Sequence, residues 1–286
     1  MVVKKNAVLL LSCPDQPGIV AAVADFVFRH GGNIVDAQQH TDRTDGVFFQ
    51  RIEFELDGAD LGRDEIRPAM DDLAARFGMH CEVRFTDEVP RVGLLVSREG
   101  HCLVDLLARS RRGELAVDIP VVISNHPEQG EVASWFGVPF HHLPVMPETK
   151  PEQERAVEQL LQANGVTLVV LARYMQILSP DFCTRWRERV INIHHSFLPA
   201  FSGGRPYHQA HDRGVKLIGV TAHYVTADLD EGPIIDQDVT RVSHRDAVDD
   251  LRRRGRDLEV AVLARAVRAH VEHRILVHGR RTVVFD

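Results

Sequence analysis

The chain has 286 residues, of which 44% are hydrophobic and 26% are charged, and its formal net charge at pH 7 is −7. This composition excludes a disordered or fibrous chain, and the acidic balance argues against the clustered basic surface that binds nucleic acid. No segment reaches the ~18 apolar residues of a membrane span, and the four cysteines are widely spaced without a CxxC pair. We therefore expect a cytoplasmic protein of two domains, with no membrane or nucleic-acid partner and no disulfide framework.

The first domain is predicted over residues 7–86. Apolar residues recur at helical spacing from Ile19 until Gly31 and Gly32 supply a stop, and a second helix is expected over 64–77. Strands are expected at 7–13, 33–40, 47–56 and 80–85. The resulting β-α-β-β-α-β order predicts a ferredoxin-like fold, followed by a linker over 86–90.

The second domain is predicted over residues 91–286. Continuous apolar strands at 92–96, 119–124, 167–172 and 190–194 alternate with helices, which is typical of a mostly parallel, Rossmann-like α/β sheet buried on both faces. Two further strands and a long helix over 246–273 close the domain. Because such sheets bind ligands beyond the carboxyl ends of their strands, the loops after Val96, Ala172 and His194 form the candidate site.

One cluster of polar residues lies where the strand 190–194 ends. Asn192 and His194 are two residues apart, so both side chains should project from the same face of the strand. An amide beside an imidazole can stabilise a developing oxyanion. On spacing alone the alternative stays open that Asn192 caps a turn and that His194 is a hydrogen-bonded core histidine.

A second cluster follows the strand that carries His223. Asp228, Asp230 and Glu231 lie in a turn that ends at Gly232. A carboxylate in such a loop can orient an imidazole or activate water, although Asp and Gly are also common in turns for purely conformational reasons. His101 and the other histidines show no pair with metal-ligand spacing next to a carboxylate, so no metal site is predicted.

Together these motifs resemble a known superfamily. The Asn192-Ile193-His194 triplet, the SFLP stretch after it, His223 and the LDEGP turn resemble the folate-dependent formyltransferases and deformylases. The blocks CPDQPGIVA at 13–21 and FLPAFSGGRPYHQAHDRGVK at 197–216 resemble the deformylase branch more closely. The resemblance implies that Asn192, His194 and Asp230 are catalytic. It also implies a folate cleft formed by Met175, Gln176, Ile177, Leu178, His223, Thr226 and Asp228, with Gln176 standing where many relatives have a basic residue.

The activity that the resemblance implies is hydrolysis of 10-formyltetrahydrofolate to formate and tetrahydrofolate, which supplies formate in one-carbon metabolism and purine synthesis. The folate is then the substrate, and no separate cofactor is expected. Two alternatives are a formyltransferase with an amine acceptor and a non-catalytic folate or amino-acid sensor. The stretch 96–107 has a single glycine, which disfavours a phosphate-bearing acceptor such as glycinamide ribonucleotide.

The first domain resembles an ACT domain, a family whose paired copies often bind amino acids. The resemblance implies a homo-oligomer, a dimer or a tetramer, with a small amino acid as effector. The effector site is expected at Asp15, Gly18, Asn33 and Ile34. The alternative is that Asp15 and Gly18 only shape a turn and that the domain serves only to oligomerise.

Overall fold

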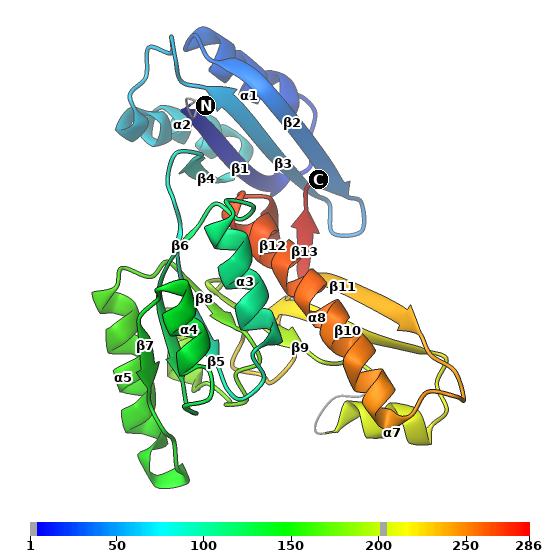
Figure 1. Ribbon diagram of the computed structural model, residues 1–286. Coiled ribbons are helices and arrows are strands. Elements are labelled where there is room, and N and C mark those ends of the chain that lie inside the picture. The colour runs from blue at the N-terminus through cyan, green and yellow to red at the C-terminus, as the bar shows by residue number, and fades with distance from the viewer. Residues whose placement is uncertain (1–4, 201–204) are drawn as a thin grey trace. The chain divides into compact units, whose positions relative to one another are not determined.

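The computed structural model of the chain describes residues 5–200 and 205–286 (Figure 1). It divides into two compact units. The first holds the residues up to Val89 together with Glu272–His278 and Thr282–Asp286, and the second holds Pro90–Val271 with Gly279–Arg281. Positions 201–204, inside the FLPAFSGGRPY block, lie outside the described residues.

The first unit confirms the predicted ferredoxin-like order. Its elements are β1 (Asn6–Pro14), α1 (Ile19–Arg29), β2 (Asn33–Asp42), β3 (Val47–Glu55), α2 (Arg63–Phe77) and β4 (His80–Phe85). The strands form an antiparallel sheet in the order β2-β3-β1-β4. β1 has an unbroken apolar run over residues 7–11 because both of its faces are buried there, with Leu9 and Leu11 on one face and Val8 and Leu10 on the other.

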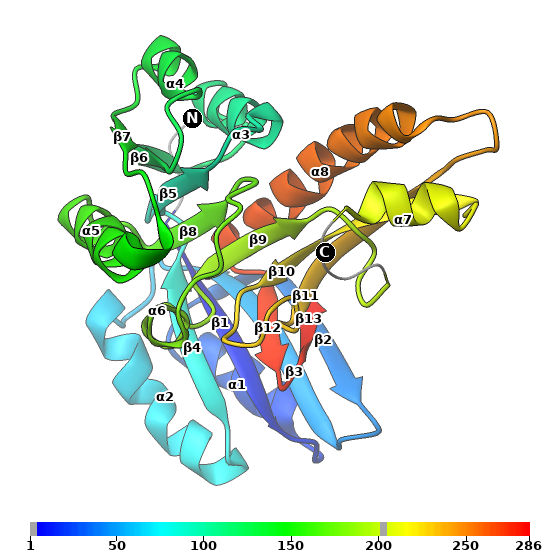
Figure 2. The same cartoon turned by 90° about the horizontal axis from the view of Figure 1, so that it is seen from below.

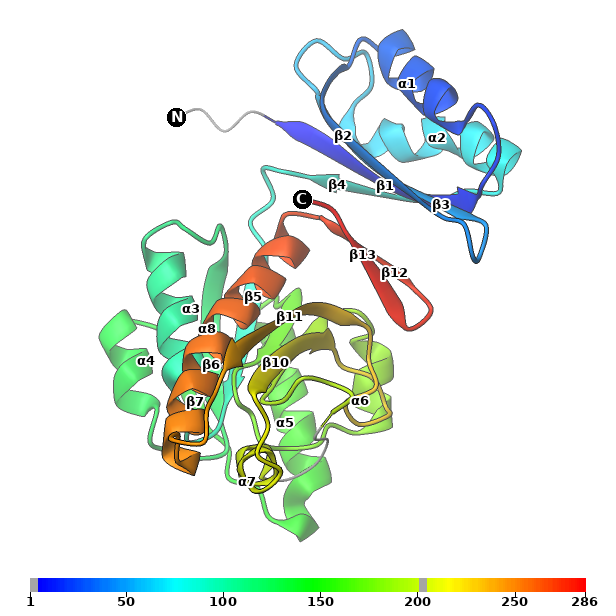
Figure 3. The same cartoon turned by 90° about the vertical axis from the view of Figure 1, so that its right-hand side faces the viewer.

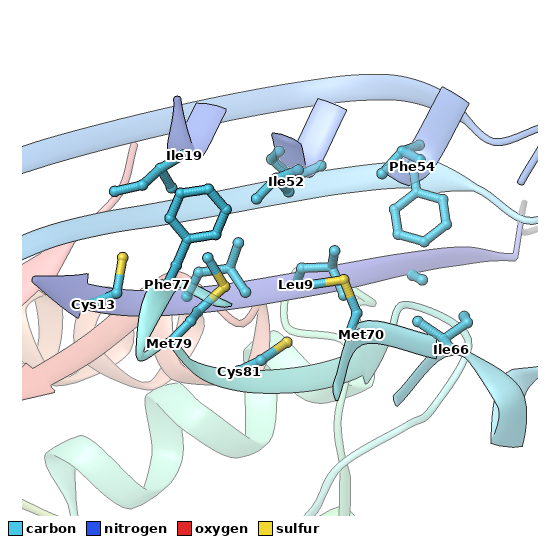
Figure 4. Close-up of a cluster of buried hydrophobic side chains, with 14 of the residues drawn as sticks. Leu9, Cys13, Ile19, Ile52, Phe54, Ile66, Met70, Phe77, Met79 and Cys81 are labelled. Atoms are coloured by element: carbon cyan, nitrogen blue, oxygen red, sulfur yellow. The ribbon is translucent and has the colours of Figure 1, made fainter. Parts of the chain in front are cut away.

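The two helices cover one face of this sheet (Figure 1). Figure 4 shows Leu9, Ile52 and Phe54 from the strands meeting Ile19 of α1 and Met70 of α2. Each of these side chains is at most 4% exposed. Burying a side chain of this size stabilises the fold by about 1.5–3 kcal/mol, so the helix-facing side of the sheet is the main core of the unit.

The opposite face of the first sheet is covered by a C-terminal hairpin, which the sequence did not predict. This hairpin consists of β12 (Ile275–His278) and β13 (Arg281–Val284), and it lies beside β1 and β3 (Figure 3). Leu276 and Phe285 pack against Val8, Leu10 and Phe49. The structure therefore groups these residues with the first unit, whereas a single domain over 91–286 was expected. The reason is that a two-stranded hairpin is barely stable alone and gains stability by burying its apolar side chains on a sheet.

The second unit begins with β5 (Arg91–Val96), α3 (His101–Arg111), β6 (Asp118–Ser124), α4 (Gly130–Phe136), β7 (Phe140–His142), a 3-10 turn η1 (Pro147–Thr149), α5 (Lys150–Ala163) and β8 (Leu168–Leu171). It continues with α6 (Pro180–Arg185), β9 (Val190–His194), α7 (Pro206–Asp212), β10 (Leu217–Tyr224), β11 (Ile234–Arg241) and α8 (Val248–Val271). Every helix among the described residues is too short or too polar to cross a membrane.

A seven-stranded sheet in the order β11-β10-β9-β8-β5-β6-β7 forms the centre of the second unit. Neighbouring strands are parallel across β9, β8, β5, β6 and β7, whereas β10 is antiparallel to both β9 and β11. This arrangement confirms the predicted mostly parallel sheet. α3 and α8 lie on one face and α5 on the other (Figure 2). The chain runs outward from β5 through β6 to β7 and then returns to β8 on the other side of β5. The sheet therefore has its switch point between β5 and β8, where such folds bind ligands.

Candidate active site

A cleft of about 340 Å³ lies at the carboxyl ends of β8 and β9. This volume falls within the range of small-molecule sites, which is roughly 300–1,000 Å³. Its lining includes most of the residues that the sequence predicted, namely Asn192, His194, Asp230, Met175, Gln176, Ile177, Leu178, His223 and Thr226. Asp228 is not part of the lining, and its carbonyl oxygen accepts a hydrogen bond from the Thr226 hydroxyl. The structure thus brings the three predicted catalytic residues to one cavity.

The loop after β8 forms the apolar wall of this cleft. Met175 and Ile177 are more than half exposed, whereas Leu178 is buried. Ser97, which directly follows β5, fixes the loop because its backbone N–H donates to the Arg173 carbonyl at 3.2 Å and its hydroxyl accepts from the Met175 N–H at 3.0 Å. Exposed apolar side chains at the edge of a cavity provide a surface for a flat ring system.

Asn192 is held by a histidine on the neighbouring strand. β9 and β10 are antiparallel, and their register places His223 opposite Asn192. The Asn192 side-chain nitrogen, Nδ2, lies 3.3 Å from His223 Nε2. His223 Nδ1 lies 2.9 Å from the Tyr224 carbonyl oxygen, which can only accept. His223 therefore donates through Nδ1 and accepts through Nε2, which is the pattern of a neutral imidazole.

Burial also keeps His223 neutral. The residue is 2% exposed, and the loss of solvent lowers the pKa of His223 below the ordinary imidazole value. The hydrogen bond to Tyr224 and the nearby Asp230 carboxylate oppose this shift without reversing it. One N–H of the Asn192 amide is consequently used by His223, and the other is left for a ligand in the cleft.

Asp230 faces His194 from the LDEGP turn. Its Oδ1 lies 3.3 Å from His194 Nδ1 and 3.8 Å from His223 Nε2. The hydrogen bond from His194 lowers the pKa of Asp230 below its ordinary value, despite the opposing effect of burial, so the group is a carboxylate at neutral pH. His194 Nε2 is buried and has no hydrogen-bond partner in the part of the chain that the structure describes. It is the ring atom available to a reacting group.

The backbone of the turn explains its glycine. Asp230 has a left-handed φ of 57°, and the chain then passes directly against the end of β10. A Cβ atom at Gly232 would collide with the Tyr224 carbonyl oxygen, which also faces His223 Nδ1. Glycine is therefore required at this position for the carboxylate to approach the two histidines.

The sequence missed a buried ionic cluster beside the cleft. Glu259 of α8 is 1% exposed, and its two carboxylate oxygens accept hydrogen bonds from His101 Nε2 at 2.7 Å and the Tyr207 hydroxyl at 3.0 Å. Arg173 Nε lies 3.4 Å from the same oxygen that His101 contacts. Burial pushes the pKa of Glu259 upward, but His101 and Arg173 hold it below its ordinary value. The sequence did contain a sign of this cluster. Glu259 lies at helical spacing with Leu251, Gly255 and Leu263, so an acidic residue could be expected on the buried face of the long helix.

The same cluster contains a grouping of metal-ligand types. His101, Cys102 and Glu259 place one ligand atom each within 4.8 Å of one another. Burial raises the pKa of the Cys102 thiol well above its ordinary value, which disfavours the thiolate that binds metals. The guanidinium of Arg173 next to Glu259 also disfavours a second cation. This chemistry suits an ionic cluster better than a metal centre.

The structure does not gather the predicted effector residues around one cavity. Gly18 lines a broad groove between α1 and α2, together with Asp25, Arg29 and His30. Asn33 instead donates to Glu55 on β3 at 3.0 Å, and Ile34 packs against the core. Asp15 is exposed beside the turn at Gly46, to whose carbonyl oxygen its backbone N–H donates at 2.8 Å. The effector site remains a prediction.

Comparison with known proteins assigns both units. The formyl transferase family model matches residues 90–267, and the ACT domain model matches residues 7–74. The chain is 56% identical to the formyltetrahydrofolate deformylase of Synechocystis sp., over 98% of each chain, and 42% identical to that of Escherichia coli K12, also over 98% of each.

Solved structures give the same result. A formyltetrahydrofolate deformylase from Pseudomonas syringae pv. tomato is 48% identical, with a TM-score of 0.97 over 100% of this chain and 96% of that one. A glycinamide ribonucleotide transformylase from Symbiobacterium toebii is 38% identical, with a TM-score of 0.67 over 71% of this chain and 97% of that one. The chain, with its ACT domain followed by a formyl transferase domain, therefore belongs to the formyltetrahydrofolate deformylase family.

Proposed function

We propose that the protein hydrolyses 10-formyltetrahydrofolate to formate and tetrahydrofolate. The observation that carries this proposal is the meeting of Asn192, His194 and Asp230 in one cleft of a chain that belongs to the deformylase family. The reaction breaks the bond between the formyl carbon and N10 of the folate and forms a new bond from that carbon to a water oxygen. No cofactor is needed, because the amide carbonyl is itself the electrophile.

Asn192 and His194 are placed to stabilise the tetrahedral intermediate. When water attacks, negative charge develops on the formyl oxygen, and the amide N–H of Asn192 that His223 does not use can donate to it. His194 presents Nε2 to the same cavity while its Nδ1 faces Asp230. The Asp230 carboxylate faces Nδ1 and so orients the ring, and Nε2 donates to the oxyanion when both ring nitrogens carry a proton.

Asp230 also provides a route for the proton. The carboxylate accepts one proton of the attacking water, and this proton is passed to N10 as the carbon–nitrogen bond breaks, so that the leaving group departs as a neutral amine. The second water proton remains on the product acid, which releases it to solvent as formate. His223 acts as a positioning residue, since it fixes the orientation of the Asn192 amide and contacts neither reacting atom.

Formyl transfer to an amine is the second candidate, and the likeness to the transformylase structure favours it. The loop that leads into α3 supports water as the acceptor. It carries a single glycine, and His101, the first residue of α3, is hydrogen-bonded to Glu259. A glycine-rich phosphate-binding turn is therefore missing from this position, which lies within the described residues.

The experiment is to mix the purified protein with 10-formyltetrahydrofolate in the absence of any amine acceptor. Hydrolysis predicts one formate per tetrahydrofolate, with many turnovers per protein. A protein that releases tetrahydrofolate only after an amine is added, with the formyl group recovered on that amine and no formate formed, would be a transferase. A protein that binds the folate without turnover would be a sensor.

The first unit extends the proposal. An ACT domain joined to a deformylase domain suggests that a small amino acid regulates turnover and that the protein works as a homo-oligomer, a dimer or a tetramer. All four cysteines are unpaired, which suits the reducing cytoplasm in which we place the protein. Formate release measured across a panel of amino acids, with the mass in solution from light scattering, tests regulation and assembly together.

A further inference from the structure

A second, smaller cavity adjoins the folate cleft in the catalytic unit. Its volume is about 180 Å³, well below the roughly 300 Å³ at which pockets hold drug-sized ligands, so it suits a very small molecule. Three residues line both cavities, namely Arg173, His195 and Arg205. The smaller cavity, called the arginine cavity below, therefore shares part of its wall with the cleft that holds the catalytic residues.

The charge of the arginine cavity favours an anion. Its lining contains four arginines against two glutamates. Arg256 is paired with Glu99 at 2.8 Å, and Arg252 is paired at 2.8 Å with Asp249, which lies outside the lining. His195 adds no charge at neutral pH, because burial and the nearby Arg173 lower the pKa of His195 to about 4. Arg173 and Arg205 then face Glu259, so the lining keeps one excess positive charge beside the proposed site of formate production.

Arg173 is the most buried arginine of this cavity. Its side chain is 13% exposed, and among the described residues neither Nε nor Nη1 has a hydrogen-bond acceptor. Its backbone also has a left-handed φ of 64°, a conformation that costs about 1 kcal/mol or more for a residue other than glycine. A buried guanidinium with unused donors is costly unless something else binds it.

Glu259 does not fulfil this role. Its oxygens already accept from His101 and Tyr207, and its contact with Arg173 is 3.4 Å long and lacks hydrogen-bond geometry. A structural pair in the same unit looks different, because Arg185 donates to both oxygens of Glu158 at 2.7 Å each. Glu259 balances the charge of Arg173 and leaves N–H donors on Nε and Nη1 unused, and guanidinium N–H groups are strong donors to a carboxylate.

We propose that Arg173 binds the formate released by hydrolysis and that the arginine cavity holds this product as it leaves the cleft. The inference rests on the proposed function, because only the hydrolytic reaction produces a free carboxylate next to Arg173. Formate binds without any change of covalent bonds: its two oxygens accept N–H bonds from the guanidinium. The folate product remains in the larger cleft.

The test measures the binding of formate to the full chain without folate, by titration of ¹³C-formate in NMR or by calorimetry. Wild type should bind formate in the millimolar range, and Arg173→Gln should weaken binding by about tenfold or more, as expected for loss of a charge-assisted bond. The matched control is Arg109→Gln, which removes a partly buried arginine paired with Asp105 on α3, away from both cavities, and should leave formate affinity unchanged.

Two further variants keep the test decisive if Arg173→Gln does not fold. Arg173→Lys keeps the charge but not the planar fork, and it should weaken formate binding. Glu259→Gln removes the competing negative charge and should tighten formate binding, an effect that a purely structural ion pair would not produce. No formate binding to wild type would overturn the inference, and so would unchanged affinity in both of these variants.

Other ligands distinguish the source of the carboxylate. Tetrahydrofolate and formate should bind to the protein at the same time. Competition between them would mean that the glutamate carboxylate of the folate occupies the arginine cavity, and it would contradict the inference. Tighter binding of inorganic phosphate than of formate would also contradict it.

Formate release from 10-formyltetrahydrofolate is measured on the same samples. A protein that turns over but does not bind formate refutes only the product site, and one that binds formate without turnover refutes the proposed hydrolysis.

Discussion

The side-chain nitrogen of Asn192 lies 3.3 Å from Nε2 of His223, which in turn donates through Nδ1 to the Tyr224 carbonyl oxygen. This chain of contacts fixes which way the Asn192 amide points. Its carbonyl oxygen cannot face His223 while the ring is neutral, because Nε2 carries no proton. The amide donor that stabilises the oxyanion therefore depends on the protonation state of a histidine that takes no part in the chemistry.

The first prediction concerns that histidine. Because burial depresses the pKa of His223, the ring should stay neutral, with its proton on Nδ1, as pH falls below the ordinary imidazole value of about 6.5. Because the unfolded chain protonates this histidine more readily than the folded chain, the stability of the fold should decrease as pH falls from the unfolded pKa toward the lower folded pKa. ¹⁵N NMR of the ring nitrogens between about pH 8 and pH 5 measures this directly. Detection of an Nε2–H tautomer at pH 7 would contradict the assignment.

The second prediction concerns Asn192. Replacing Asn192 by Ala removes one oxyanion donor and should lower kcat by about a hundred- to a thousand-fold, or about 3–4 kcal/mol of transition-state stabilisation. KM for the folate should change much less, because the charge on the formyl oxygen develops only in the transition state. Formate release at saturating folate measures the effect. Asn164→Ala, at the end of α5, is the control and should leave kcat unchanged.

The third prediction concerns Asp230 and pH. Since the hydrogen bond from His194 lowers its pKa, Asp230 contributes stability that is present above the unfolded value of about 3.9 and is lost as pH falls through the lower folded value. Urea unfolding of wild type should therefore show a steeper loss of stability below about pH 4 than unfolding of Asp230→Asn. Identical pH dependence in the two proteins would show that the ion pair with His194 is absent.

The same variant tests the proton route. With Asn at position 230, no carboxylate accepts the proton of the attacking water, and kcat should fall by about 10²–10⁴-fold at every pH. Asp228→Asn is the matched control, since this carboxylate is in the same loop but outside the cleft lining. It should retain nearly full turnover.

The fourth prediction concerns the C-terminal hairpin. Phe285 is 5% exposed and packs on the outer face of the first sheet, so Phe285→Ala should destabilise the first unit by about 3–5 kcal/mol. Val284→Ala, at a neighbouring position that is 38% exposed, should cost much less. Hydrogen exchange of the β1 and β3 amides measures both effects. Equal protection of these amides in the two variants would mean that the hairpin does not stabilise the sheet.

The elements that could be predicted from the sequence are those with strong periodicity. The β-α-β-β-α-β order and the buried parallel strands could be predicted because the spacing of apolar residues within each segment indicates whether that segment is a helix or a strand. The hairpin at 275–284 was missed because strands of four residues carry little periodicity and their apolar side chains make sense only against a distant sheet.

The candidate site shows the same division. The spacing of two between Asn192 and His194 was enough to place both side chains on one face of β9. Asp230 needed the family resemblance, because its approach to His194 depends on a left-handed backbone in an irregular turn. Arg173 and Glu259 were missed because they come from a loop and a helix far apart in the chain, and only folding brings their charges together.

The order of synthesis gives the hairpin a consequence during translation. The strands β1 to β4 leave the ribosome first, but the side chains of Leu276 and Phe285 that cover Val8, Leu10 and Phe49 are made only after the whole catalytic unit. A nascent chain halted anywhere before Ile275 therefore presents an uncovered apolar sheet surface to the cell, which makes it a natural client for chaperones and a poor candidate for expression as a fragment.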